Sequence, residues 1–242
     1  SMTNYEIRTT YIPFHDWDGV GGPYTFMANL QRDMKNRGLT SCTSYLGADQ
    51  LFFPIQYDME KLHWGRVRGK RFIMRLDGVY YPQKHPETWR QQNQKIKEIY
   101  QHYADLVIFQ SEYSKRQCFE MFGEKTDSKY AVIINGADPS IYHPAEATRS
   151  DDGPVRFITT GNFRDAAMLE PLILALDKST FPNGMQLEII GPVKDELKSL
   201  TDRDYVTCTG TLTAQQTAEL LREADIFLYS HLNPPCPNSV IE

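Results

Sequence analysis

Short apolar segments with the pattern of β-strands alternate with helix-like segments along almost the whole sequence. The strand-like segments are rich in β-branched and aromatic residues, and each ends near Gly, Asp, Asn or Ser. They cover 7–14, 40–46, 51–56, 70–76, 105–110, 130–134, 155–160, 185–190, 205–208 and 225–230. Strands separated by helices predict parallel sheets with helices on both faces, in which ligands bind beyond the carboxyl ends of the strands.

The helix-like segments place apolar residues on one face and carry end signals. In the first, Phe26, Met27 and Leu30 share a face, and Gly38 ends the helix. The last begins after Thr213, a residue type that caps helix N-termini. The predicted helices are 23–37, 86–103, 112–122, 166–178, 194–200 and 213–223.

A polar segment at 145–154, AEATRSDDGP, divides the chain and has the composition of a linker. The first 143 residues contain 18 Lys and Arg against 16 Asp and Glu, and the remainder contains 8 against 15. The two halves therefore differ in charge as well. We predict an α/β protein with a Rossmann-like domain at 1–144, a linker at 145–154, a second Rossmann-like domain at 155–242, and a cleft between the domains.

Charge and cysteine spacing exclude several function classes. A net charge of −5 argues against a dedicated nucleic-acid binder. No run of 18 apolar residues occurs, and the N-terminal residues lack the apolar core of a signal peptide. The cysteines form no CxxC pair and the histidines no HExxH motif, so we expect no metal site and a reducing cytoplasm.

Two stretches of the first domain are candidates for substrate contact. The turn DGVGGP at 18–23 precedes the first helix, so its amides either face a phosphate or form a tight corner. It is not GxGxxG, and Pro23 removes one amide, which argues against a dinucleotide site. In RLDGVYY, Asp77 ends a predicted strand and either closes a turn or projects into the cleft.

A basic run at 61–71, KLHWGRVRGKR, permits two interpretations. In the first, its cations bind anionic lipid headgroups or a phosphorylated acceptor. In the second, the run is a solvated loop followed by a charged edge strand, whose charges protect against aggregation. They are Lys61, Arg66, Arg68, Lys70 and Arg71.

The second domain offers candidate residues at two strand ends. In TTGNFRDAAM at 159–168, Arg164 either binds a diphosphate or pairs with Asp165 or another surface acid. The final stretch, SHLNPPCPNSVIE, predicts a helix that begins near Asn238 and carries Glu242 on its first turn. Because the sequence stops there, we expect the second domain to be incomplete.

Taken together, the motifs resemble the family 4 glycosyltransferases, which have the GT-B fold. The resemblance rests on the glycine pair Gly21-Gly22 and on five ordered segments across the chain. These are ADLVIFQSEYSKR, VIINGADPSIYHP, LEIIGP, VTCTGTLTAQQTAELLREADIFLYS and CPNSVIE. The resemblance implies transfer of a sugar, with retention, from a nucleoside-diphosphate sugar to a glycan, polysaccharide or lipid-linked acceptor, without a metal or other cofactor. We expect a cytoplasmic protein, and contact of the basic run with the inner membrane face is one of the two interpretations of that run.

The resemblance also implies roles for particular residues. Asp77 is assigned to the catalytic position near the reacting sugar, and Glu242 to the ribose hydroxyls as the second glutamate of an E-x7-E pair. The donor-binding residues are Gly21, Gly22, Asn162, Arg164, Asn238 and Glu242.

The sequence departs from the family pattern at three places. The first glutamate of the pair is Pro234, and the usual basic pair is replaced by Gly161-Asn162 and by Ala167 or Met168. The histidine expected at a first-domain strand end has no clear match. The alternative is therefore a non-catalytic relative that binds glycan or a partner enzyme. A third interpretation, a sugar-nucleotide 2-epimerase, lacks that family's acid–histidine set.

Overall fold

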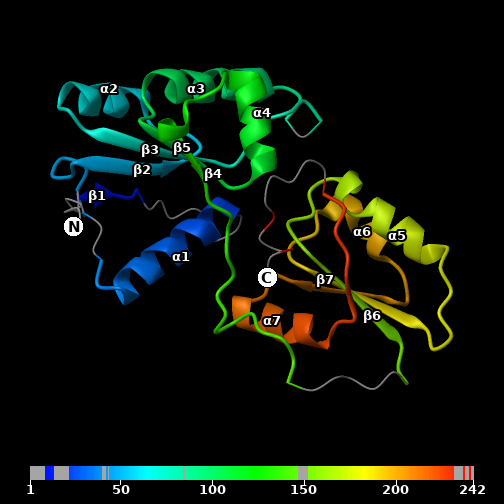
Figure 1. Cartoon of the computed structure of the whole chain (residues 1–242). Coiled ribbons are helices and arrows are strands. Elements are labelled where there is room, and N and C mark those ends of the chain that lie inside the picture. Colours follow the sequence, from blue (N-terminus) through cyan, green and yellow to red (C-terminus); the bar gives the residue numbers. More distant parts are fainter. Residues whose placement is uncertain are drawn as a thin grey trace. The chain divides into compact units, whose positions relative to one another are not determined.

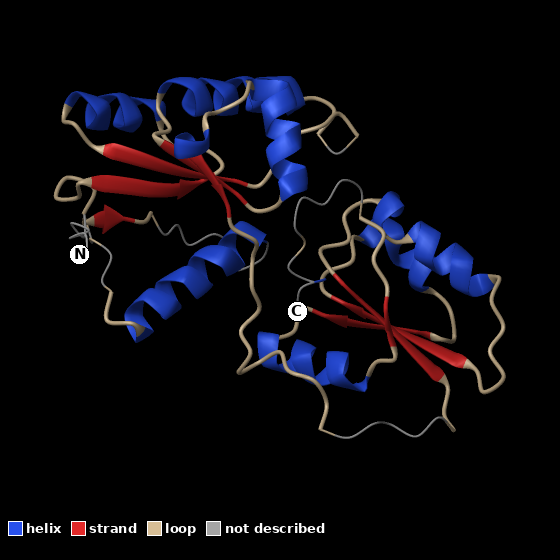
Figure 2. Ribbon diagram, in the orientation of Figure 1, coloured by secondary structure: helices blue, strands red, loops and turns tan. Residues whose placement is uncertain are grey.

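The computed structural model describes residues 9–13, 22–39, 42, 44–83, 85–146, 152–231, 237 and 240 (Figure 1). The chain divides into two compact units, Ser1–Asn135 and Gly136–Glu242. Each unit contains a parallel sheet with helices on both faces (Figure 2), which confirms the predicted fold class. The division lies nine residues before the predicted one, because segment 136–144 groups with the second unit, where Arg222 Nη1 donates to the Ile141 carbonyl oxygen at 3.2 Å.

Unit 1 has five parallel strands in the order β1-β2-β3-β4-β5. Its elements are β1 (Thr10–Tyr11), α1 (Gly22–Asn36), β2 (Gln50–Pro54), α2 (Met59–Val67), β3 (Arg71–Leu76), α3 (Trp89–His102), β4 (Leu106–Phe109), α4 (Glu112–Phe122), η1 (Asp127–Lys129) and β5 (Tyr130–Val132). A parallel bridge between Tyr11 and Cys42 lies on the side of β1 away from β2. Among the described residues, this bridge is what remains of the predicted strand at 40–46.

The basic run at 61–71 differs from the predicted loop and edge strand. Most of it forms α2, which begins after Asp58, whose carboxylate accepts a hydrogen bond from the Lys61 amide at 3.0 Å. The rest enters β3, which lies between β2 and β4 and is therefore an interior strand. The edge-protection interpretation of these cations is thus wrong.

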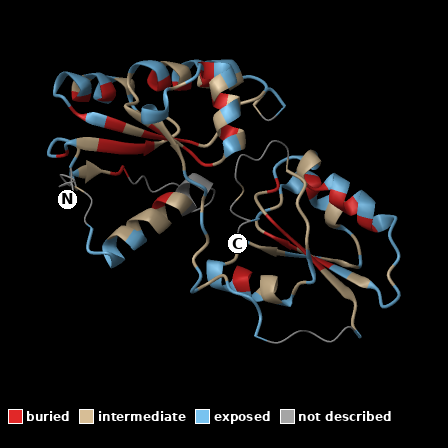
Figure 3. Cartoon of the chain, in the orientation of Figure 1, coloured by how far each residue is buried: buried red, intermediate tan, exposed pale blue. Residues whose placement is uncertain are grey.

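Alternating side chains give the sheet of unit 1 two apolar faces. Most of β2 is buried (Figure 3). One face packs under α2, α3 and α4 and is the larger core. It includes Leu51, Phe53, Phe72, Met74, Leu76, Val107 and Phe109, all fully buried. The other face carries Phe52, Ile73 and Ile108 and packs against Met27 and Phe26 of α1. α1 and the group α2–α4 therefore cover opposite faces.

Unit 2 has four parallel strands in the order β8-β7-β6-β9. Its elements are β6 (Val155–Thr160), η2 (Ala166–Met168), α5 (Glu170–Asp177), β7 (Met185–Ile190), η3 (Asp195–Leu197), α6 (Lys198–Thr201), β8 (Val206–Gly210), α7 (Ala214–Glu223) and β9 (Ile226–Phe227). Its core includes Phe157, Phe163, Leu169, Ile173, Leu187 and Ile189. Among the described helices of both units, none is long and apolar enough to cross a lipid bilayer.

Both sheets reverse their direction of growth beside their first strand. In unit 1 the chain passes from β1 to Cys42 on one side, and then to β2 on the other. In unit 2 it passes from β6 through β7 to β8, and then returns to β9 on the far side of β6. Ligands of open parallel sheets bind beyond the carboxyl ends of the strands at such a reversal, so these edges are where a site is expected.

Candidate functional site

A network of buried polar side chains joins the carboxyl ends of three strands in unit 1. Arg75 on β3 donates from Nη1 to Asp77 Oδ1, and from Nη2 to Gln110 Oε1 at 2.9 Å. The same Nη2 donates to Asn135 Oδ1 at 2.6 Å. Asp77 directly follows β3, Gln110 directly follows β4, and Asn135 lies beyond the end of β5. The network therefore fixes Asp77 at the edge of the sheet.

Arg75 is an uncommon residue for this position, since it is buried inside a strand. Its side chain is 2% exposed, and its guanidinium carbon lies 3.7 Å from the ring centre of Phe26 on α1. Gln110 Nε2 also donates to the Asp77 carbonyl oxygen at 2.9 Å. Three charge-assisted hydrogen bonds and an aromatic ring thus compensate the buried guanidinium.

Asp77 keeps contact with solvent, with 20% of its side chain exposed, and Asn135 is likewise only partly buried. Burial raises the pKa of Asp77 above its ordinary value, and the Arg75 guanidinium only partly opposes this shift. A carboxylate with a perturbed pKa at the carboxyl edge of a parallel sheet is a candidate functional group. It can accept a hydrogen bond from a substrate hydroxyl.

The sequence pointed to Asp77 but missed its three partners. The burial of Arg75 had one signal in the sequence. The alternation in RFIMRL places Arg75 on the same face of the strand as the apolar Ile73. Gln110 and Asn135 are 35 and 60 residues from Arg75, and local pattern carries no information on such contacts.

At the edge of unit 2, a glycine directly follows each of β6 and β7, and these two glycines are in direct contact. The Gly161 amide donates to the Ile190 carbonyl oxygen at 3.0 Å, and Gly191 has φ +111°. A Cβ on Gly191 would lie 1.9 Å from the Gly161 carbonyl oxygen. A Cβ on Gly161 would lie 2.9 Å from His231 Cε1, beyond the end of β9. The ends of β6, β7 and β9 therefore converge at the reversal point.

The loop after β6 presents two polar side chains, Asn162 and Arg164, that make no side-chain hydrogen bond or ion pair with the described residues. Asp165 accepts a hydrogen bond from the Ala167 amide at 2.8 Å and so caps η2. Arg164 is exposed and, among the described residues, forms no ion pair, which separates it from the predicted partner Asp165. Asn162 is half-buried, and no hydrogen bond of its side chain is found in the described part of the chain. Both can contact an anion at this edge.

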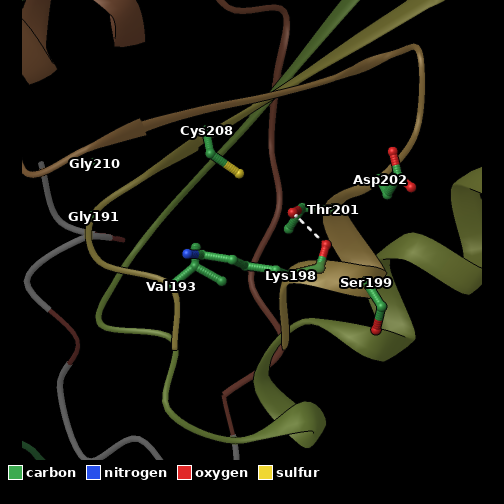
Figure 4. Close-up of a pocket in the computed structure, with 8 residues that line it drawn as sticks. All are labelled: Gly191, Val193, Lys198, Ser199, Thr201, Asp202, Cys208 and Gly210. Carbon is green, nitrogen blue, oxygen red and sulfur yellow. Dashed lines mark hydrogen bonds between the residues drawn. The ribbon is translucent and has the colours of Figure 1, made fainter. Parts of the chain in front are cut away.

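A cavity of about 690 Å³ lies beside this edge, between the ends of β7 and β8 and helix α6 (Figure 4). Lys198 and Cys208 extend into it from α6 and β8. Lys198 Nζ is 2.7 Å from Asp195 Oδ1, and Gly191 and Gly210 border the cavity where their amide and carbonyl groups bond at 2.7 Å. The volume is within the range of small-molecule sites.

The cations of the basic run are not equivalent. Lys70 is 7% exposed and donates to the carbonyl oxygens of Leu46 and Ala48. Arg66 pairs with Asp105 at 3.1 Å and donates to the Tyr103 carbonyl oxygen. The side chains of Lys70 and Arg66 are therefore engaged in contacts within unit 1. The remaining three are exposed: Lys61, Arg68 and Arg71.

Several predicted residues lie outside the described part of the chain. They are Gly21, Asn238 and Glu242, together with Pro234 at the departure from the family pattern. Gly22 is the first residue of α1, and Ala167 lies in η2. In the described ranges, no group of three or more His, Cys, Asp or Glu side chains is placed to hold a metal ion.

Comparisons with known proteins bear on the fold. No protein-family model matches the sequence, and no curated protein matches it. Solved structures do match. HepE of Anabaena, crystallised with UDP and glucose, has a TM-score of 0.58 and 12% identity, with 89% of this chain and 59% of HepE covered. Sucrose-phosphate synthase of Thermosynechococcus elongatus has a TM-score of 0.60 and 15% identity, with 89% and 56% covered.

A third match is the lipopolysaccharide outer core galactosyltransferase WaaB, with a TM-score of 0.56 and 16% identity. The alignment covers 88% of this chain and 56% of WaaB. The chain thus spans less than 60% of the length of each of these three structures. At such low identity the matches show the fold alone, and that fold is the GT-B fold.

Proposed function

We propose that this chain takes part in a nucleotide-sugar-dependent glycosyl transfer. A nucleoside-diphosphate sugar binds at the carboxyl edge of unit 2, and a glycan, polysaccharide or lipid-linked acceptor binds at unit 1. The observation that carries the proposal is Arg164, which lies beside the reversal point of the unit 2 sheet and forms no ion pair with any residue that the structure describes. Arg164 supplies the guanidinium that pairs with the diphosphate, and Asn162 donates beside it.

The reaction proceeds with retention, as the family 4 resemblance implies, and needs no metal or other cofactor because charged side chains stabilise the leaving diphosphate. Asp77 lies near the reacting sugar, and Arg75 is its positioning residue. Gly21, Gly22, Asn238 and Glu242 remain predicted donor contacts. The exposed cations Lys61, Arg68 and Arg71 give unit 1 an affinity for anionic headgroups, which suits a lipid-linked acceptor at the cytoplasmic membrane face.

A second candidate function is supported by one observation. The family resemblance calls for a lysine at position 167 or 168, and these positions hold Ala167 and Met168, in the short helix η2 that Asp165 caps. A chain with one cation in this loop binds a diphosphate without fully neutralising the charge that leaves during transfer. The second candidate is therefore a non-catalytic protein that binds glycan or a partner enzyme.

We expect Arg164→Ala to weaken binding of UDP or GDP about tenfold, because the variant loses one charge-assisted contact. Isothermal titration with each nucleotide measures this. Lys178→Ala is the matched control, since Lys178 is an exposed cation at the opposite end of α5 and should leave the affinity unchanged. Equal affinities for wild type and Arg164→Ala would remove Arg164 from the site.

Catalysis needs a separate measurement. The protein is incubated with a panel of nucleotide sugars and acceptor glycans, and the released nucleoside diphosphate is measured. Release that depends on acceptor supports transfer. Nucleotide binding without release under any condition supports the non-catalytic candidate. A folded protein that binds no nucleotide contradicts donor binding at unit 2.

A further inference from the structure

Four aromatic rings line a cavity of about 460 Å³ in unit 1. They come from Tyr11 on β1, Tyr45 in the loop before β2, Tyr57 after β2, and Trp64 on α2. Tyr45 is the central ring, with its centre 5.6 Å from that of Trp64, 5.9 Å from Tyr11 and 6.2 Å from Tyr57. We call this group the aromatic pocket.

The aromatic pocket is separate from the polar network around Asp77. The rings of Tyr11, Tyr45 and Tyr57 pack onto the core beneath α2, α3 and α4. Arg75 instead stacks on Phe26 of α1, on the other face of the sheet. A ligand of the aromatic pocket therefore does not contact the network.

Two contacts hold the central ring in place. The Tyr45 hydroxyl donates to the Lys61 carbonyl oxygen at 2.7 Å, which ties the loop to α2. Gly65 faces the same hydroxyl, and a Cβ at that position would lie 2.1 Å from it. A glycine in the middle of a helix costs stability, so its use here makes room for the ring. The pocket wall is thus preorganised.

Several hydrogen-bonding groups around the pocket are unused. Among the described residues, the hydroxyls of Tyr11 and Tyr57 and the Trp64 indole N–H make no hydrogen bond. Glu60 also lines the pocket, and its exposed carboxylate forms no ion pair within the described chain. Aromatic faces with free donors and acceptors at their edges suit a ligand that is apolar on its ring faces and polar at its rim.

The charges around the rings exclude a cationic ligand. Lys61 Nζ lies 5.9 Å from the ring centre of Tyr57, and Lys70 Nζ lies 5.3 Å from that of Tyr45. The Arg68 guanidinium lies 4.2 Å from the Trp64 ring. The chain's own cations thus occupy the electrostatic sites that a quaternary ammonium group would need.

We infer that the aromatic pocket binds a pyranose ring of a neutral glycan. The C–H faces of a pyranose pack on aromatic rings, and its hydroxyls both donate and accept hydrogen bonds. The hydroxyls can therefore form hydrogen bonds with both Glu60 and Lys61, two consecutive residues of opposite charge that line the pocket. This inference does not depend on donor binding at unit 2, because the pocket consists of unit 1 residues alone.

Saturation-transfer NMR with four disaccharides tests the inference: maltose, cellobiose, lactose and chitobiose. We expect at least one to bind, with Tyr57→Phe weakening its affinity about threefold and Glu60→Gln about threefold. Both changes keep the shape of the side chain, so they do not threaten the fold. Trp64→Ala should abolish the signal, and Trp89→Phe, on α3, should leave it unchanged.

The inference is overturned if the folded wild type gives no signal with any disaccharide, or if Tyr57→Phe and Glu60→Gln both bind like wild type. Vesicles of phosphatidylcholine and phosphatidylglycerol test the alternative ligand, a lipid. A response of Trp64 fluorescence to these vesicles, with none to sugar, would assign the pocket to lipid and also overturn it. Because UDP is absent from every arm, loss of nucleotide binding in unit 2 would not affect the result.

Discussion

Replacing Gly191 by alanine lowers the free energy of unfolding of unit 2 by at least about 3 kcal/mol, from left-handed backbone strain and overpacking combined. The residue has φ +111°, and the added Cβ would lie 1.9 Å from the Gly161 carbonyl oxygen. That atom belongs to backbone already bonded to Ile190, so it has little freedom to move. The change therefore separates the ends of β6 and β7, where the donor is proposed to bind.

Two glycines serve as controls for the separate contributions. Gly184 has φ +78° and open space around it, so Gly184→Ala carries only backbone strain, about 1–2 kcal/mol. Gly153 also has open space around it but no positive φ, and Gly153→Ala should change stability by less than about 0.5 kcal/mol. A Gly191→Ala variant no less stable than Gly184→Ala would contradict the close contact between the two strand ends.

The tryptophans allow the two units to be followed separately. Trp17, Trp64 and Trp89 all belong to unit 1, so fluorescence reports on that unit, whereas circular dichroism reports on both. In urea titrations, Gly191→Ala should move a transition seen by circular dichroism and leave the fluorescence transition in place.

Arg75→Met is expected to destabilise unit 1 by about 3–5 kcal/mol, because it leaves Asp77 without its counter-charge in a mostly buried position. Gln110 and Asn135 also lose their shared donor. The fluorescence transition in urea measures the effect. Arg90→Met is the control, since Arg90 is exposed and lies over the Trp89 ring, and it should cost less than about 1 kcal/mol.

The destabilisation by Arg75→Met should also depend on pH. Without the guanidinium, nothing opposes the effect of burial, so the pKa of Asp77 in the folded variant lies further above its ordinary value. A raised carboxyl pKa contributes stability that is present at low pH and is lost as pH rises through the folded pKa. The variant should therefore differ less from wild type at pH 4.5 than at pH 8. A difference independent of pH would contradict the pairing of Arg75 with Asp77.

The fold was predictable because alternating strands and helices leave few arrangements, yet α2 was missed. Only Leu62 and Gly65 of this helix are buried, so its apolar periodicity is weak. Gly65 is also unfavourable in a helix interior, although the approach of Tyr45 and Phe72 requires it. The local signals of the helix were the capping residue Asp58, Glu60 in the first turn and Arg66 in the last turn.

Only those residues of the candidate site that come after the end of a predicted strand could be predicted from the sequence. Asp77 and Arg164 were singled out because each follows a predicted strand. The choice between a diphosphate and Asp165 as the partner of Arg164 could not be made locally, because it depended on how Asp165 caps η2. The convergence of Gly161, Gly191 and His231 joins three strand ends, and only the tertiary structure reveals it.

The most direct test of donor binding is backbone amide NMR of the isotope-labelled chain during titration with UDP, GDP and ADP. The account predicts that at least one nucleotide shifts the amide signals of Asn162, Arg164 and Gly210, at the carboxyl edge of unit 2. Signals at the opposite edge, such as those of Lys178 and Gly184, should stay in place. Shifts confined to that opposite edge, or no shifts at all with a folded protein, would contradict it.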